Sequence, residues 1–183
     1  TLIIVLPSRY AGGELVVPSI LVGRADYPTE AIADTSRRFR QLGIGYANLG
    51  ALLMALGLPY DSDGGRAYAA AVTSLMTGHA YEVSARTASR MGPFAGFAEN
   101  REHMLRVLGQ HQEAAARIDE ELVPPDLLSA AQESWDSACE LGAAYGVRNA
   151  VYPLGLSFVE LVAPLHEDTP AARFVRRGAR RGA

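Results

Sequence analysis

Residues 42–56 read Leu-Gly-Ile-Gly-Tyr-Ala-Asn-Leu-Gly-Ala-Leu-Leu-Met-Ala-Leu. Nearly every side chain in this stretch is apolar or small, which predicts a single helix that is buried on most sides. Its three glycines, Gly43, Gly45 and Gly50, are expected to let neighbouring backbones approach closely. A helix buried in this way needs packing partners, so the rest of the chain is expected to supply them.

Four further helices are predicted from apolar residues at helical spacing and from the residues that begin or end helices. Pro28 suits a first helical turn, and the short helix that follows it is expected to end near Arg38. Downstream, Gly92 and Pro93 end a long helix, prolines begin the last helix and a glycine stops it. These three later helices are predicted at about 65–91, 99–118 and 125–145.

The two ends of the chain have a different pattern from its middle. The apolar runs Leu2–Leu6 and Leu15–Val17 flank a turn-forming segment, which predicts a β-hairpin. Residues 150–163 are apolar and β-prone again. The predicted fold class is therefore mainly α with short β-hairpin or strand edges, in three segments: 1–22, 27–149 and 150–183.

Composition sets limits on the class of protein. The chain has 183 residues, 49% of them hydrophobic, which is enough for a real core in one domain. Its single cysteine, Cys139, cannot form an internal disulfide, and we find no targeting signal, so a cytoplasmic location is expected. The longest apolar runs are interrupted well short of the ~20 residues that cross a bilayer, so no membrane partner is expected.

Two short motifs resemble ligand loops, but their context favours structural roles. Gly43-x-Gly45 has no strand signal before it and has Asn48 where a dinucleotide loop needs its third glycine, so close helix packing is the favoured interpretation. Asp61–Gly64 opens like a calcium loop, but Val72 occupies the place of the twelfth ligand. An acidic cap on the long helix is the favoured interpretation there.

Four isolated side chains are candidates for chemistry. His79, His103 and His111 lie in predicted helices without the i, i+4 spacing of a two-ligand metal site, so they are expected to be solvated or at the edge of the core. Cys139 has no histidine nearby in the sequence and is expected to be an inert, partly buried thiol. The sequence therefore predicts no metal site and no catalytic residue.

Several blocks of sequence in the middle of the chain resemble one internal stretch of a larger enzyme. Between about 27 and 149, the chain resembles the adenosylcobalamin-dependent (class II) ribonucleotide reductases. The block around Gly45-Tyr46-Asn48 is the most specific. The blocks are Tyr27–Ala33, Arg38–Arg40, Leu42–Met54, Leu58–Asp63, Leu75–Gly78, Met91–Phe94 and Gly142–Asn149.

The resemblance implies a fold and a chemistry. In that family these helices form part of the wall of a ten-stranded α/β barrel, where cobalamin cleavage generates a thiyl radical and cysteine thiols reduce the nucleotide. The family also places a Pro-Thr-Gly-Thr turn for substrate phosphates after the last helix. The counterpart here keeps the proline and glycine but not the threonines, so Gly155 and Ser157 are the implied phosphate-binding residues.

The expected function is that of a partial ribonucleotide reductase large chain. The family needs one radical cysteine and a reducing pair, and Cys139 cannot fill three roles, so the chain is expected to be inactive alone. Adenosylcobalamin is the cofactor of the parent family only. The expected partners are nucleotides and the remainder of a reductase chain, or a second copy in a homo-oligomer.

Two alternative functions come from other classes. The first is a helical interaction module whose arginine-rich tail, Arg173–Arg181, binds nucleic acid through its charge. The second is a remnant of a 2-oxoglutarate and iron oxygenase, because His166 and Asp168 have the spacing of two iron ligands and Thr1–Val17 faintly resembles that family. No histidine follows His166 to complete the iron site.

Overall fold

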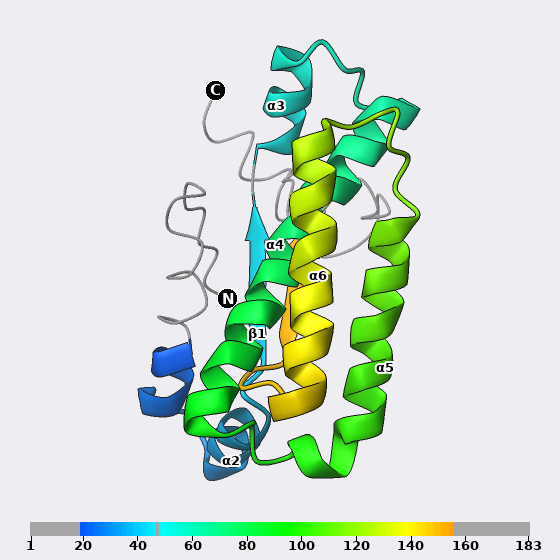
Figure 1. The fold of residues 1–183 in the computed structure, drawn as a ribbon. Helices are drawn as coiled ribbons and strands as arrows, with labels where there is room; N and C mark the ends of the chain where they lie inside the picture. Colours follow the sequence, from blue (N-terminus) through cyan, green and yellow to red (C-terminus); the bar gives the residue numbers. More distant parts are fainter. Residues whose placement is uncertain (1–18, 47, 156–183) are drawn as a thin grey trace, which may run out of the picture.

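A two-stranded parallel sheet and the helices between its strands organise the chain (Figure 1). The computed structural model describes residues 19–46 and 48–155. Strand β1 is followed along the chain by four helices and then by β2, which pairs with it. The long helices α4 and α6 pack against each other, and α5 packs on α6. Their bounds are β1 Leu42–Tyr46, α3 Leu49–Ala55, α4 Asp63–Met91, α5 Phe97–Ala116, α6 Pro125–Tyr145 and β2 Val151–Gly155.

The prediction of one helix across residues 42–56 is wrong for residues 42–46. Residues 42–46 form β1, and only Leu49–Ala55 form a helix, α3. Gly43 and Gly45 each disfavour a helix by about 1 kcal/mol relative to alanine, and they alternate with large side chains at strand spacing. The two glycines therefore lie in a paired strand rather than in a helix contact or a phosphate loop. Asn48, at φ 76°, separates the strand from α3.

The two strands are in register over five residues each. Leu42 lies opposite Val151, and Tyr46 lies opposite Gly155. The tyrosine Tyr81 of α4 fastens this sheet to the helices, because its hydroxyl donates to the carbonyl of Val151 at 2.9 Å and accepts from the amide of the same residue at 3.2 Å. The β-prone interpretation of the segment after 150 is confirmed for 151–155. Within the described residues the sheet has two strands and closes no barrel.

Helices α2 (Glu30–Phe39) and α4 begin at hydroxyl caps. The side chain of Thr29 accepts a hydrogen bond from the amide of Ile32, and that of Ser62 accepts one from the amide of Gly65. An N-terminal cap of this kind satisfies an amide that has no partner within the helix. A side-chain cap was predicted at this end of α4, and the structure has one there. The capping group is the Ser62 hydroxyl rather than a carboxylate, because Asp61 and Asp63 form ion pairs with Arg66 at 2.6 and 2.7 Å.

Helices α5 and α6 follow the sequence prediction closely. Pro125 occupies the first position of α6, where its missing amide costs nothing, and Gly146 ends that helix at φ 73°. Helix α5 begins two residues earlier than expected, after Gly96. The mainly α fold class predicted from the sequence is thus confirmed for the described residues.

The core lies between α4, α6 and the sheet. Trp135 of α6 is 1% exposed, and its ring lies 5.9 Å from that of Tyr81 on α4. The two helices approach closely at Gly78, where an added Cβ would overlap Ser134 and lie 3.0 Å from the Trp135 ring. A glycine is needed at this crossing because any side chain would push the helices apart.

The N-terminal segment is helical where it is described. Residues 19–24 form a helix, so the β-prone interpretation of 1–22 is wrong for residues 19–22. The hydroxyl of Ser19, in this helix, accepts a hydrogen bond from the guanidinium of Arg40 at the end of α2. A local sequence pattern cannot predict a tertiary contact of this kind. The predicted hairpin runs, Leu2–Leu6 and Leu15–Val17, lie outside the described residues. None of the described helices combines the length and apolar character needed to cross a membrane.

Candidate functional site

The carboxyl ends of β1 and β2 lie side by side at one edge of the sheet. Parallel strands present their carboxyl ends together, and ligands of α/β folds bind at this edge. Gly155, implied to bind substrate phosphate, is the last residue of β2 and lies opposite Tyr46. Ser157 lies outside the described residues. The structure places Gly155 at this edge, and phosphate binding by either residue stays a prediction.

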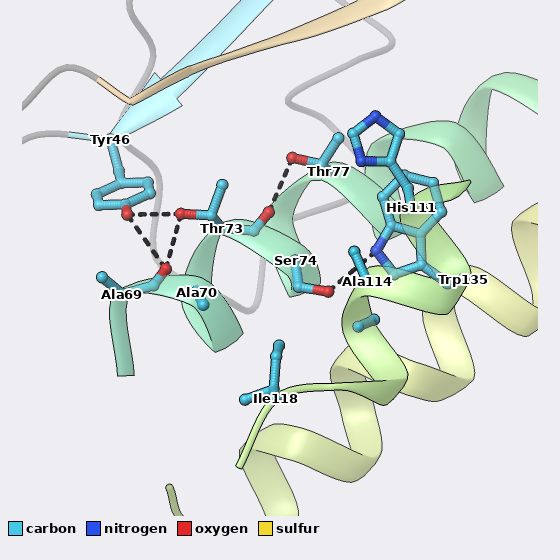
Figure 2. Close-up of a pocket in the computed structure, with 11 residues that line it drawn as sticks. Tyr46, Ala69, Ala70, Thr73, Ser74, Thr77, His111, Ala114, Ile118 and Trp135 are labelled. Carbon is cyan, nitrogen blue, oxygen red and sulfur yellow. Dashed lines mark hydrogen bonds between the residues drawn. The ribbon is translucent and has the colours of Figure 1, made fainter. Parts of the chain in front are cut away.

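Tyr46 ties this edge to α4. Its hydroxyl lies 2.7 Å from Oγ1 of Thr73, and that threonine hydroxyl donates to the carbonyl of Ala69 at 2.7 Å (Figure 2). The Tyr46 hydroxyl also lies 3.5 Å from the Ala69 carbonyl, so either hydroxyl can be the donor in the pair. The chain of hydrogen bonds fixes where β1 ends relative to α4 and therefore positions the edge.

A pocket of about 330 Å³ opens beside Tyr46, between α4, α5 and α6. Ala69, Ala70 and Ala114 make much of its wall apolar, while hydroxyl groups of α4 line one side (Figure 2). Ser74 contributes one of these hydroxyls and accepts a hydrogen bond from Nε1 of Trp135 at 3.0 Å. Apolar walls with a few placed polar groups are typical of small-molecule sites, and the volume is at the lower end of their range.

His111 is the titratable side chain of this pocket. Its imidazole stacks on the indole of Trp135, with ring centroids 4.9 Å apart and ring planes 11° from parallel. Burial lowers the pKa of His111 because a charged imidazole loses hydration there. The imidazole is therefore neutral near pH 7, and it serves as a flat wall of the pocket. The predicted place at the edge of the core is confirmed for His111.

The other predicted side chains do not converge on the pocket. His79 lies 2.9 Å from the carboxylate of Glu82, and exposed His103 lies beside Arg106. Cys139 is half-buried on α6, where burial, and then the charge of Asp136, raise the pKa of its thiol. A thiol with a raised pKa is a poor nucleophile at neutral pH, as predicted.

The described residues were compared with what a metal or a corrinoid would need. No group of three or more His, Cys, Asp or Glu side chains gathers in the part of the chain that the structure describes. The pocket beside Tyr46, at about 330 Å³, has the volume of a small ligand rather than that of a corrin ring with its attached nucleotide. His166 and Asp168, the oxygenase candidates, lie outside the described residues.

A buried network at the opposite, amino ends of the strands was missed by the sequence prediction. Asn149 is 1% exposed, and its side-chain amide donates to the carbonyl of Arg40 at 2.9 Å and accepts from the hydroxyl of Ser19 at 2.8 Å. The hydroxyl of Ser84 bonds both the amide and the carbonyl of Asn149, at 2.8 and 2.9 Å. No local signal marks Asn149, because its partners are distant in the sequence.

Comparisons with known proteins identify the family of this chain. The family model described as the barrel domain of ribonucleotide reductase matches residues 17–153, which include β1, the helices between the strands and the first three residues of β2. This chain belongs to the ribonucleotide reductase family. The resemblance noted in the sequence is thereby confirmed.

Relatives of this reductase chain share about half of its residues over the matched region. A vitamin B12-dependent ribonucleotide reductase of Streptomyces avermitilis is 51% identical over 142 residues, covering 75% of this chain and 14% of the relative. Those of Rhodopirellula baltica and Agrobacterium fabrum are 47% and 45% identical, covering 74% of this chain and 13% and 12% of the relatives. The chain thus spans about one seventh of the length of these relatives.

Proposed function

We propose that this chain is a scaffold unit of a vitamin B12-dependent ribonucleotide reductase and has no reductase activity alone. The observation that carries the proposal is the pairing of β1 with β2 across the intervening helices, inside the region that matches the barrel domain. Two adjacent parallel strands with their crossover helices make one segment of a barrel wall. The remainder of a reductase chain is the proposed partner, and nucleotides are the proposed substrates.

The residues of the unit position the edge of the sheet rather than perform radical chemistry. Tyr46 and Thr73 hold the end of β1 against α4, and Gly155 places backbone at the end of β2 for a substrate phosphate. Adenosylcobalamin is the proposed cofactor of the complete enzyme, where it supplies the radical. Cys139 sits on the helix layer with a raised thiol pKa, which supports a structural role for it.

An activity assay tests the first half of the proposal. The purified chain is incubated with adenosylcobalamin, a dithiol and ribonucleotides, and deoxynucleotides are measured by chromatography. The Streptomyces avermitilis relative, assayed in parallel, shows that the reagents are competent. We expect deoxynucleotides from the relative and none from this chain, and product formation by the chain alone would contradict the proposal.

A chimera tests the scaffold role. Residues 17–153, the matched region, replace the corresponding segment of the Streptomyces avermitilis reductase. At 51% identity the substituted helices are expected to support the barrel, so the chimera should reduce ribonucleotides. A chimera that unfolds as cooperatively as the parent enzyme but makes no deoxynucleotide would show that the unit is not an equivalent scaffold.

The alternative functions gain no support from the comparisons or from the described residues. The arginine tail proposed for nucleic-acid binding and the two oxygenase residues lie outside the described residues. The matched relatives are reductases, and none of them is named as an oxygenase or a nucleic-acid-binding protein. We therefore advance the scaffold function alone.

A further inference from the structure

The pocket beside Tyr46 keeps its space because small side chains form much of its wall. Ala69 and Ala70 line it from α4, at one of its sides. Ala114 and Ala115 line it from α5. Helices that pack together normally leave few voids larger than a water molecule, whereas this pocket has a volume of about 330 Å³. The space between the three helices is therefore large enough for a small ligand.

Aromatic rings from three different elements also line the pocket. Tyr46 comes from β1, His111 from α5 and Trp135 from α6 (Figure 2). The imidazole and indole rings stack, with centroids 4.9 Å apart. Aromatic side chains pack favourably against other rings in offset or edge-to-face arrangements. This lining therefore favours a ligand that contains an aromatic ring.

Two polar groups of the pocket retain hydrogen-bonding capacity. The Ser74 hydroxyl accepts from Nε1 of Trp135 at 3.0 Å, and its own proton has no acceptor within the described residues. The imidazole of His111 stacks on the same indole and forms no hydrogen bond with another described residue. A neutral imidazole offers one donor and one acceptor nitrogen. Because both groups contact Trp135, they lie close enough together for one ligand to reach both.

The pocket is polar without being charged. The described residues that line it include no Asp, Glu, Lys or Arg. Burial lowers the pKa of His111, so its imidazole is neutral near pH 7. An ion that entered the pocket would lose hydration and find no opposite charge in exchange. The lining therefore favours an uncharged ligand and disfavours the phosphate groups of a nucleotide.

We propose that this pocket is a binding site for a small, uncharged aromatic amide. The amide carbonyl accepts a hydrogen bond from the Ser74 hydroxyl, and the amide N–H donates to the unprotonated nitrogen of His111. The aromatic ring of the ligand packs among the apolar and aromatic side chains of the wall. This binding goes beyond the scaffold function and does not depend on it, because every residue that it uses lies in this chain.

Fluorescence titration of the whole chain tests the site, because Trp135 is the only tryptophan in the sequence. Benzamide is the probe, and benzoate has nearly the same shape but carries a negative charge. Excitation is at a wavelength that tryptophan absorbs and the two probes do not. Benzamide is expected to change the emission saturably with a Kd on the order of 1 mM, as suits a ligand of its size. Benzoate is expected to bind at least about tenfold more weakly, because its charge would be desolvated.

Three variants locate the binding in the pocket. Ala114→Leu fills part of the space and is expected to abolish the saturable change. His111→Phe keeps a ring beside Trp135 but removes both nitrogens, and Ser74→Ala removes the hydroxyl. Each of these two is expected to raise the Kd about 2- to 10-fold, which corresponds to one hydrogen bond. Because the phenylalanine narrows the pocket and the alanine widens it, weaker binding by both cannot come from a change in volume.

Each variant has a matched control outside the pocket. Ala98→Leu adds the same side chain at another exposed position of α5, and His103→Phe makes the same exchange two turns away on that helix. Ser89→Ala removes an exposed hydroxyl from α4. All three controls are expected to bind benzamide as the wild type does. Circular dichroism checks that each variant is folded, and where Ala114→Leu is not, His111→Phe and Ser74→Ala carry the test.

Any one of three outcomes would overturn the proposal. The first is a wild type whose emission shows no saturable response to benzamide, and the second is an equal Kd for benzamide and benzoate. The third is a wild-type Kd in folded Ala114→Leu, or in both His111→Phe and Ser74→Ala. A failed scaffold chimera would leave the binding of benzamide to this chain unchanged, so the two proposals fail separately.

Discussion

At the scale of single residues, the position of β2 depends on buried polar atoms that hydrogen-bond one another. Ser84, with no exposed surface, donates to and accepts from the backbone of Asn149. Asn149 in turn bonds Arg40 and Ser19, so one amide side chain joins three distant parts of the chain. A buried group of this kind stabilises the fold only while each partner is present.

Removal of the Ser84 hydroxyl should destabilise the chain. Ser84→Ala leaves the amide and carbonyl of Asn149 without this partner, and the expected loss is about 1–3 kcal/mol in the free energy of unfolding. Urea unfolding measures it. Ser89→Ala is the control, because that exposed hydroxyl on the same helix bonds only a neighbouring carbonyl. Equal free energies for the two variants would contradict the role given to Ser84.

His111 should make stability depend on pH. Its folded pKa lies below the unfolded value of 6.5, so the unfolded chain binds more protons at mildly acidic pH. Its contribution is therefore fully present above pH 6.5 and decreases as the pH falls from there toward the folded pKa. His111→Phe should reduce this acid-side loss, measured by urea unfolding at pH 7.5 and 5.5. Equal losses of stability between the two pH values in the wild type and in His111→Phe would contradict this role.

The sequence predicted the properties of single side chains better than their partners. The partial burial of Cys139 and the helical positions of the histidines follow from local spacing, and the structure confirms them. The stacking of His111 on Trp135 and the network around Asn149 join residues that are distant along the chain, so no local pattern contains them.

At the scale of elements, the boundaries of the later helices were predictable because their ends carry local signals. Pro125 and Gly146 bound α6 as expected, and Gly92 bounds α4. Strand β1 was mistaken for helix because its hydrogen-bond partner, Val151–Gly155, is remote in the sequence and because the small and apolar residues of 42–46 continue directly into those of α3. A five-residue strand buried in a parallel pair has no pattern of its own that excludes a helix.

Two glycine substitutions should change the free energy of unfolding in opposite directions, one at the contact between α4 and α6 and one at an open position on α5. Gly78→Ala places a methyl group against Ser134 and Trp135, and the expected cost is about 1–3 kcal/mol. Gly109→Ala, on α5, meets nothing within 4 Å and should stabilise the chain by about 0.5–1 kcal/mol, because alanine favours a helix. Chemical denaturation measures both, and stabilisation by Gly78→Ala would contradict the close approach.

At the scale of the whole molecule, the described chain leaves several large apolar side chains exposed. Met54 on α3 is 74% exposed, and Leu52 and Leu56 beside it are 40% and 48% exposed. Neighbouring apolar side chains of this kind commonly mark contact surfaces. A homo-oligomer was one expectation from the sequence, and it stays a prediction.

We predict that the exposed apolar side chains of α3 cause the chain to self-associate. Sedimentation velocity at increasing concentrations should show larger species for the wild type, and Met54→Gln should shift them toward the monomer. Met91→Gln is the matched control, because Met91 is 66% exposed at the end of α4, away from α3. If Met91→Gln alone reduced association, or if the wild type stayed monomeric, the contact surface would not be at α3.

The number of residues between the two paired strands also affects folding during synthesis. Arg40 and Asn149, at the joined ends of β1 and β2, are 109 positions apart. At about 5–20 residues per second of synthesis, the first strand waits about 5–20 s before its partner leaves the ribosome. During that interval its backbone amides and carbonyls are an open edge for pairing with another chain. The delay leaves Leu42–Tyr46 open to incorrect pairing while the rest of the chain is synthesised.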